Sequence, residues 1–156
     1  MHFLVLIFLF ASLNLVAQAD ACIFCRIAAG KEDQSKTIIY SDQSVVAFMS
    51  HGPRNPGHVL VIPVTHAKLL TDLPDSTARE LISIARKIAL AIKKTDIKAE
   101  GFNFQTNSGE ASGQEVFHVH MHVIPRFTGE SAPSKRILGV NELEPVAVKI
   151  REALKR

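Results

Sequence analysis

The sequence contains no internal repeat and no low-complexity tract, and it carries no large excess of charge of either sign. Its formal net charge is +3, which neither demands nor excludes a polyanionic partner. The 156 residues are 47% hydrophobic and 21% charged, a composition that suits one globular domain with its own core. Evidence for a function must therefore come from local motifs.

Charged residues are also absent from the first 19 positions. This segment is very apolar and ends in Ala17-Gln18-Ala19, a pattern that predicts a secretory signal peptide over residues 1–19. It is short for a membrane span, which needs about 20 apolar residues. We therefore expect a secretory or extracellular location. Because the basic residues that open a signal peptide are missing, a signal anchor, or a cytoplasmic protein with a mis-assigned start codon, are the alternatives.

Cysteine is scarce, since the chain has only Cys22 and Cys25, separated by two residues. The pair could form a disulfide in an oxidising compartment or could bind a metal ion. A thioredoxin-like redox motif needs a strand before the first cysteine and a helix that opens there. Only a short segment lies upstream, so that interpretation is weak.

Hydrophobic periodicity predicts an α+β domain. Runs of β-branched and aromatic residues indicate strands, and one amphipathic stretch indicates a long helix. At the C-terminus, Asn141 and Glu144 resemble a capping box, with Pro145 in the first turn of the helix. We expect an antiparallel sheet of about five strands with the helices packed on one side. The predicted strands span residues 37–40, 45–49, 58–62, 102–106 and 116–124; helices span 74–94 and 141–154, with a helical turn or two over 22–29.

Three histidines alternate with apolar residues at 118, 120 and 122. Alternation is the period of a half-buried strand, so the three imidazoles share one face, roughly 7 Å apart at about 3.3 Å per residue. A neutral imidazole is a good nucleophile near pH 7, because its ordinary pKa is about 6.5. Attack on phosphorus would give a covalent nucleotidyl-histidine.

This stretch resembles the His-φ-His-φ-His-φ-φ signature (φ, apolar) of the histidine triad, or HIT, superfamily of nucleotide hydrolases and transferases. The segments 56–63 and Gly113-Gln114 resemble further elements of the family. With Cys22-x-x-Cys25, the pattern is most similar to the Hint and bacterial-type branch. The resemblance implies the family's α+β fold, a homodimer, a HIT domain over residues 20–128, and a linker with a C-terminal helix over 129–156.

The resemblance also implies catalytic roles. In the family the middle histidine is the nucleophile, so His120 takes that role, oriented by the backbone carbonyl of His118. His122 would stabilise the charge that develops on the phosphoryl oxygens. His58 matches an upstream histidine that contacts the same phosphate. Gln114 resembles the polar residue near the scissile oxygen.

Nucleotide contacts follow from the same resemblance. Asn107 matches a position that hydrogen-bonds the ribose-phosphate, and Gln114 and Val116 are expected to contact the nucleotide, together with His120 and His122. Taken alone, Asn107 and Gln114 would be interpreted as loop-capping polar residues.

Three positions depart from the family pattern. Ser50 stands where many relatives carry an Asp that holds the ribose hydroxyls, and His51 follows where an apolar residue usually lies against the base. We expect both to lie at the nucleotide site, with His51 either stacked on the base or facing solvent. Glu115 replaces a Ser or Thr that reaches the phosphate, and a carboxylate there would repel phosphate by about 1 kcal/mol at 4 Å in water.

A structural zinc ion is expected from the resemblance. Relatives that begin with Cys-x-x-Cys complete the site with a histidine after the apolar strand and with the first histidine of the triad. These positions match His66 and His118, giving the ligand set Cys22, Cys25, His66 and His118. The alternative is a disulfide or free thiols, with His66 a surface residue.

The resemblance favours a hydrolase of purine nucleotide conjugates, with nucleoside phosphoramidates as substrates and a nucleotidyl intermediate on His120. A dinucleoside polyphosphate hydrolase similar to the Fhit branch is the alternative within this class. A non-catalytic nucleotide-binding adaptor is the second class. A DNA-end repair activity similar to aprataxins is disfavoured, because no appended nucleic-acid-binding module is visible. We therefore expect no nucleic-acid partner, and no membrane partner once residues 1–19 are removed.

Overall fold

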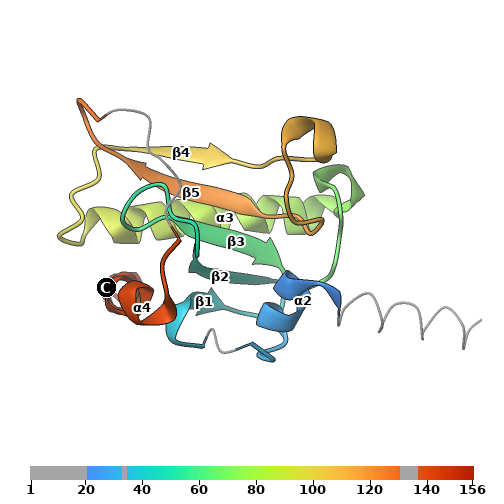
Figure 1. Cartoon of the computed structure of the whole chain (residues 1–156), viewed down its shortest axis with the longest axis horizontal. Coiled ribbons are helices and arrows are strands. Elements are labelled where there is room, and N and C mark those ends of the chain that lie inside the picture. Colours follow the sequence, from blue (N-terminus) through green and yellow to red (C-terminus); the bar gives the residue numbers. More distant parts are fainter. Residues whose placement is uncertain (1–20, 33–34, 131–136) are drawn as a thin grey trace, which may run out of the picture.

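A five-stranded antiparallel sheet organises the chain (Figure 1). The computed structural model describes residues 21–32, 35–130 and 137–156. The spatial order of the strands is β1-β2-β3-β5-β4, and each neighbouring pair is antiparallel. This confirms the predicted α+β class and the number of strands. The strands are β1 (Ile38–Ser41), β2 (Val45–Met49), β3 (Val59–Pro63), β4 (Gly101–Gln105) and β5 (Met121–Arg126).

Helices cover both faces of this sheet. The long helix α3 and the C-terminal helix α4 pack together on one face, as predicted (Figure 1). The short helix α2 packs on the opposite face, so the expectation that all helices lie on one side is wrong for this element. The helices are α2 (Ile23–Ala28), α3 (Asp75–Lys93) and α4 (Val140–Leu154), and short 3₁₀ turns span Ser35–Thr37, Leu70–Asp72 and Glu110–Ser112.

The central strands are buried on both faces because both are covered. In β2, Val45, Ala47 and Met49 belong to the core cluster that contains α3 and α4. The alternating residues Val46 and Phe48 belong to the second cluster, with α2. Because successive side chains of a strand point to opposite faces, β2 contributes alternate residues to two separate cores. The functional residues lie on the α2 side.

The histidine-rich strand is shorter than predicted. β5 begins at Met121, so two of the three triad histidines precede it. Its pairing with β3 starts at the Val61–Met121 pair, whereas the Val119 amide donates to the Ala67 carbonyl of a loop. The strand also continues through Pro125. This residue lies beyond the last one that pairs with β3, and it pairs with β4.

The start of α4 differs from the sequence prediction. Gly139 precedes the helix, and its amide donates to the Glu142 carboxylate at 3.0 Å, so the acidic capping residue is Glu142 and not Glu144. Pro145 consequently lies in the second turn instead of the first. From this start the helix turns Leu143, Ala147, Ile150 and Ala153 toward the core.

Residues 1–19, for which a signal peptide is predicted, lie outside the described residues. Within the part of the chain that the structure describes, no helix has the length and hydropathy needed to cross a membrane.

The core between the sheet and α3 predicts a specific loss of stability. Ile88 is fully buried on α3. Ile88→Ala should lower the free energy of unfolding by about 2–5 kcal/mol, because it removes buried methylenes and leaves a cavity. Arg86→Ala, at an exposed position of the same helix, should change it by less than about 0.5 kcal/mol. Urea denaturation measures both, and equal losses would contradict this packing.

Candidate functional site

Three histidines converge on the face of the sheet that carries α2. His122 is paired with Leu60 across β3 and β5, and directly paired residues share a face. His58 immediately precedes β3, and its Nε2 lies 2.9 Å from His122 Nδ1. The rings of His120 and His122 lie 5.0 Å apart between centroids. The structure thus brings together the three histidines that the sequence predicted to act on one phosphate.

A backbone amide fixes the tautomer of His58, and the His58 side chain in turn fixes that of His122. The Arg54 amide donates to His58 Nδ1 at 3.1 Å, so the proton of His58 lies on Nε2. That Nε2–H then donates to His122 Nδ1, which leaves the proton of His122 on its own Nε2. Burial, with the charges of His122 and Arg54, lowers the pKa of His58 to about 3. His58 is therefore neutral at physiological pH and acts as a fixed donor to His122.

A carbonyl fixes the tautomer of His120 in the opposite sense. His120 Nδ1–H donates to the His118 carbonyl at 2.8 Å, so the lone pair lies on Nε2. Burial lowers the pKa of His120, which keeps the imidazole neutral. The resulting group is a neutral imidazole with one nitrogen committed as a donor and the other available for attack.

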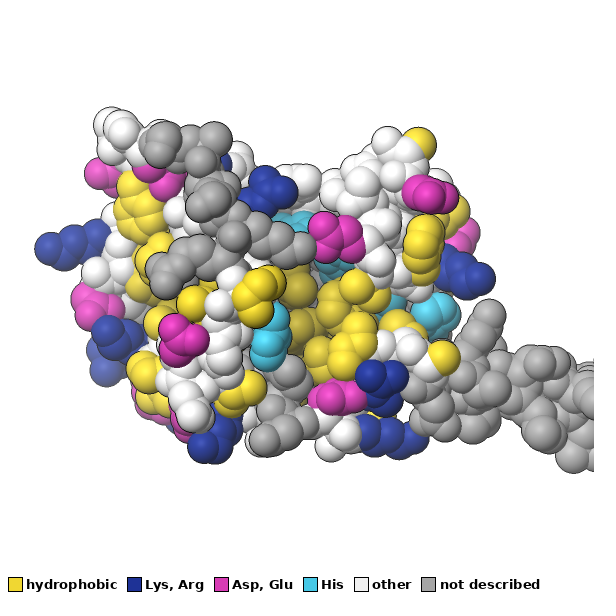
Figure 2. Space-filling view, in the orientation of Figure 1, with side chains coloured by type: hydrophobic (Ala, Val, Ile, Leu, Met, Phe, Trp, Pro, Cys, Tyr) yellow, Lys and Arg dark blue, Asp and Glu magenta, His cyan; other side chains and the backbone are white. Residues whose placement is uncertain are grey.

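A cavity of about 510 Å³ lies beside these histidines. Its volume is within the range of small-molecule sites. Figure 2 shows this face, with hydrophobic side chains in a hollow bordered by histidine side chains. The apolar part of the lining comes from α2 and the three central strands and includes Ile23, Phe24, Ile27, Phe48, Leu60 and Ile124. An apolar floor beside a polar edge suits a ligand with a flat apolar part and a charged part.

Most of the predicted nucleotide contacts line this cavity: Ser50, His51, His58, Asn107, Val116, His120 and His122. Ser50 is buried, and its amide donates to the His58 carbonyl at 2.9 Å. The His51 carbonyl accepts the Leu138 amide, and burial lowers the pKa of the His51 ring. Asn107 donates to the Gly113 carbonyl at 3.1 Å and so connects β4 to the loop before the triad.

Gln114 is placed differently from the other predicted residues. Its side chain is buried and is not part of the cavity lining. Its Nε2 donates to the carbonyls of Lys68 and Val116 at 2.8 and 2.9 Å, and its Oε1 accepts the Gly109 amide at 2.7 Å. These bonds hold the loop in shape, which agrees with the loop-capping interpretation of this residue type.

Sequence reasoning missed the apolar wall on α2 and the cavity-lining residues Arg54 and Ile137. Phe24 contacts both histidine groups, with ring centroids 5.9 Å from His118 and 5.2 Å from His120. A signal for Phe24 was available, because it lies between two predicted metal ligands. Ile137 follows the linker after β5, and no local pattern predicts where that segment returns.

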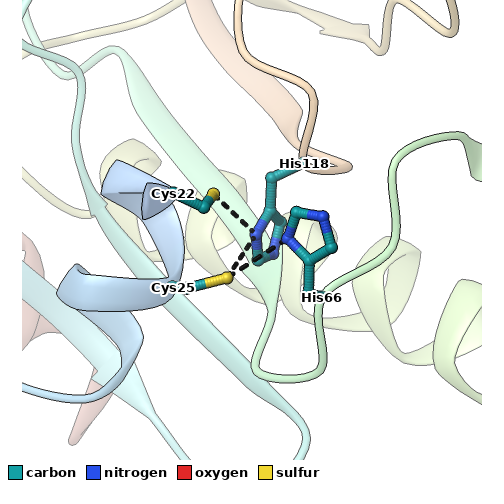
Figure 3. Close-up of side chains that lie close together, drawn as sticks. All are labelled: Cys22, Cys25, His66 and His118. Atoms are coloured by element: carbon teal, nitrogen blue, oxygen red, sulfur yellow. Dashed lines mark hydrogen bonds between the residues drawn. The ribbon is translucent and has the colours of Figure 1, made fainter. Parts of the chain in front are cut away.

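The two cysteines and two histidines form a compact cluster (Figure 3). Cys25 Sγ lies 3.2 Å from His66 Nδ1 and 3.4 Å from His118 Nδ1, and Cys22 Sγ lies 3.5 Å from His118 Nδ1. All four ligand atoms lie within 4.8 Å of one another. A tetrahedral zinc site with Zn–S and Zn–N bonds of about 2.3 and 2.1 Å gives S to N separations of roughly 3.6 Å, so the geometry fits zinc.

The chemistry of the four donors also fits zinc. His118 Nε2–H donates to the Pro63 carbonyl at 2.9 Å, which leaves the Nδ1 lone pair directed at the sulfurs. Burial lowers the pKa of His118 to about 4 and keeps it neutral. Burial and the neighbouring Cys22 raise the pKa of the Cys25 thiol to about 12. A bound cation would favour the thiolate. Neither cysteine forms a disulfide in the structure.

Comparison with known proteins identifies relatives of this chain. The model of the HIT domain matches residues 31–129. Protein hit from Bacillus subtilis is 41% identical over 109 residues, which cover 70% of this chain and 73% of that protein. A zinc-bound histidine triad family protein from Mycobacterium smegmatis has a TM-score of 0.79 and 34% identity, covering 88% of this chain and 95% of the other. A hypothetical histidine triad nucleotide-binding protein from Sulfolobus tokodaii has a TM-score of 0.77 and 29% identity. That match covers 86% of this chain and 92% of the other.

The predicted secretory or extracellular location is wrong. The finding that overturns it is the match to Protein hit from Bacillus subtilis, which groups this chain with HIT proteins. The sequence prediction depended on an apolar run that lacks the basic residues of a signal peptide, and hydrophobicity alone does not specify a destination.

The cluster predicts a measurable metal content. Protein prepared with zinc should contain about one ion per chain, and Cys25→Ser should lose it, because a hydroxyl replaces a thiolate ligand. Elemental analysis measures the content. His58→Gln, which alters a histidine outside the cluster, should retain the zinc. Full zinc content in Cys25→Ser would contradict the ligand set.

The depressed pKa of His58 predicts a pH dependence of stability. Between the unfolded pKa of about 6.5 and the folded pKa of about 3, the unfolded chain binds a proton that the folded chain does not. The free energy of unfolding should therefore fall as the pH drops from 6.5, with a contribution of up to about 1.4 kcal/mol per pH unit. Urea denaturation at several pH values should show a weaker dependence in His58→Gln. An identical dependence in both proteins would show that His58 is not held neutral.

Proposed function

The chain belongs to the HIT family, and we propose that it hydrolyses purine nucleotide conjugates, nucleoside phosphoramidates above all, by nucleotidyl transfer to His120. The observation that carries this proposal is the state of His120. Its Nδ1 proton is held by the His118 carbonyl, and its Nε2 lone pair is available in a cavity of suitable size. The solved relative from Sulfolobus tokodaii is described as nucleotide-binding, which supports a nucleotide as the ligand.

The reaction has two displacements. In the first, His120 Nε2 attacks the α-phosphorus, the bond from phosphorus to the leaving nitrogen or oxygen breaks, and the leaving group takes a proton from solvent water. His122 Nε2–H donates to a phosphoryl oxygen as charge develops, and His58 fixes the orientation of His122. In the second, water attacks phosphorus and loses a proton to the solvent, and the bond from phosphorus to His120 Nε2 breaks with its electron pair returning to the imidazole. The nucleoside monophosphate is released.

The base would lie on the apolar floor formed with Phe24, Phe48 and Leu60, because a flat ring buries the most surface there. The ribose and phosphate would lie toward Ser50, His51 and Asn107, with Val116 at the side. The hydrogen bonds of Gln114 support a positioning role, in which it holds the loop that precedes the histidines.

Zinc at Cys22, Cys25, His66 and His118 would be structural, because all four positions of a tetrahedral site are taken by protein ligands. Cys22 caps the N-terminus of α2 and Cys25 lies in its first turn, and α2 supplies a wall of the cavity. Cys22 and Cys25 would therefore hold that wall against the sheet. The zinc-bound relative from Mycobacterium smegmatis supports this choice of metal.

We also propose a homodimer and a domain division at residues 20–128 and 129–156. In the described part of the chain, β4 is at the edge of the sheet and pairs only with β5. Phe104 on this strand is 48% exposed, and Ile82 and Leu90 on α3 are 55% and 44% exposed. An unpaired edge with exposed apolar side chains favours association with a second copy.

The proposal predicts that His120→Ala lowers kcat/KM for AMP release from an adenosine phosphoramidate by more than about a thousandfold, since the nucleophile is lost. His122→Ala should lose about 100- to 1,000-fold, as expected for one donor to a developing oxyanion. Chromatographic assays of AMP release measure both. Wild-type protein denatured at alkaline pH during turnover should carry AMP on His120, detected by peptide mass spectrometry, because the bond from phosphorus to the imidazole nitrogen is labile in acid and stable in alkali.

Diadenosine polyphosphate, assayed in parallel, tests the alternative substrate class. Zinc content and cooperative unfolding of His120→Ala control for its fold. Full activity in His120→Ala would overturn the mechanism, and nucleotide binding without cleavage of either substrate would favour a binding adaptor.

A further inference from the structure

Asn55 lies in the loop between β2 and β3 and ties this loop to the C-terminal end of β5 (Figure 1). Its Nδ2 donates to the Pro125 carbonyl at 2.7 Å and to Glu130 Oε2 at 2.8 Å. Glu130 is held in turn by an ion pair with Arg126, the last residue of β5. The side chain of Asn55 therefore clamps the loop to the central sheet.

The two partners of Asn55 require an amide at this position. Both are acceptors, a carbonyl oxygen and a carboxylate oxygen, and an amide nitrogen offers one hydrogen to each. Aspartate has the same shape but no hydrogen to donate when it is ionised. The Glu130 side chain is only 18% exposed, so water solvates its carboxylate poorly if the donor is lost.

Gly57 holds the same loop against the same proline by a second contact. Its φ is +81°, a left-handed conformation that glycine adopts without strain. A Cβ at this position would lie 3.3 Å from Pro125 Cγ and 3.0 Å from Ile97 Cδ1. The loop is thus held on the carbonyl of Pro125 by Asn55 and against its ring by Gly57.

The clamped residue is directly connected to His58. The Asn55 carbonyl accepts the His58 amide at 3.1 Å. The preceding residue, Arg54, donates its amide to His58 Nδ1 at 3.1 Å, and His58 Nε2 lies 2.9 Å from His122 Nδ1. Asn55 itself does not line the cavity. It can therefore influence a bound phosphate only through the histidines.

We propose that Asn55 is a positioning residue, which holds the Arg54 amide against the His58 ring and so keeps the proton of His58 on Nε2. The inference rests on the proposed function, in which His122 Nε2–H donates to a phosphoryl oxygen. If His58 changed tautomer, its Nε2 would present a lone pair to His122 Nδ1. His122 would restore that hydrogen bond only by carrying its proton on Nδ1, and the donor to the phosphate would be lost.

The direct test is the tautomer of His58, observed by NMR of ¹⁵N-labelled imidazoles in the zinc-loaded protein. The wild type should show a neutral ring with its proton on Nε2. In Asn55→Ala the two ring nitrogen resonances of His58 should move toward each other, as in a ring that populates both tautomers. Those of His118, which the Pro63 carbonyl holds, should not move.

Kinetics of AMP release from an adenosine phosphoramidate test the consequence for catalysis. In Asn55→Ala, kcat should fall about ten- to a hundredfold, as expected when a reacting group is misplaced by a distant change. KM should change by less than about twofold, because Asn55 does not contact the nucleotide. In a His58→Ala background, Asn55→Ala should cause no further loss of kcat, because the ring through which Asn55 acts is absent.

Two further variants separate the clamp from general effects on the fold. Asn103→Ala is the matched control, since exposed Asn103 accepts a hydrogen bond from the same Arg126 but lies on β4, away from the loop. Its kcat and its His58 resonances should equal those of the wild type. Asn55→Asp keeps the shape and removes both donated hydrogens, so it should lose as much kcat as Asn55→Ala.

Unchanged His58 resonances in Asn55→Ala, or losses of kcat that multiply in the double variant, would overturn the positioning role while leaving the hydrolase intact. If the Asn55 variants do not unfold cooperatively, Glu130→Ala decides, because it removes one acceptor and keeps Asn55. It should shift the His58 resonances in the same direction, and unchanged resonances there would also overturn the role. Failure of the wild type to cleave the phosphoramidate or diadenosine polyphosphate would instead overturn the proposed function, and this inference with it.

Discussion

The hydrogen bond from His120 Nδ1 to the His118 carbonyl is the contact on which the site depends. It decides which nitrogen of His120 holds the lone pair, and therefore whether the imidazole can attack. His118 itself is held at three points, by the Pro63 carbonyl and by two cysteine sulfurs. One residue thus serves both centres, with its ring in the metal cluster and its carbonyl in the candidate active site.

Burial explains why these histidines need fixed partners. His58 and His118 are almost completely buried, and His120 is 6% exposed, so water cannot reorient or protonate the rings freely. The low pKa values keep the rings neutral, and a neutral ring can exist in either tautomer. Backbone groups of Arg54, Pro63 and His118 remove that choice. The backbone of the strands and of the loops beside them therefore determines protonation as well as position.

Much of this could be predicted from the sequence, because strand periodicity and the triad spacing are local signals. The strands and the long helix followed from patterns of hydrophobicity, and the cluster of His58, His120 and His122 from a family motif. The placement of Gln114 could not be predicted, since its partners Lys68 and Gly109 are set by loops. The wall formed by α2 and the return of Ile137 to the cavity depend on tertiary packing, which leaves no periodic signal.

The most direct test of this account is the tautomer of His120 in the zinc-loaded protein, observed by NMR of ¹⁵N-labelled imidazoles. The account predicts a neutral ring with its proton on Nδ1, in a hydrogen bond to the His118 carbonyl. It also predicts that Cys25→Ser, which releases His118 from one of its contacts, will populate the other tautomer. A His120 ring protonated on Nε2 in the zinc-loaded protein would contradict the central claim, because that nitrogen could not then attack phosphorus.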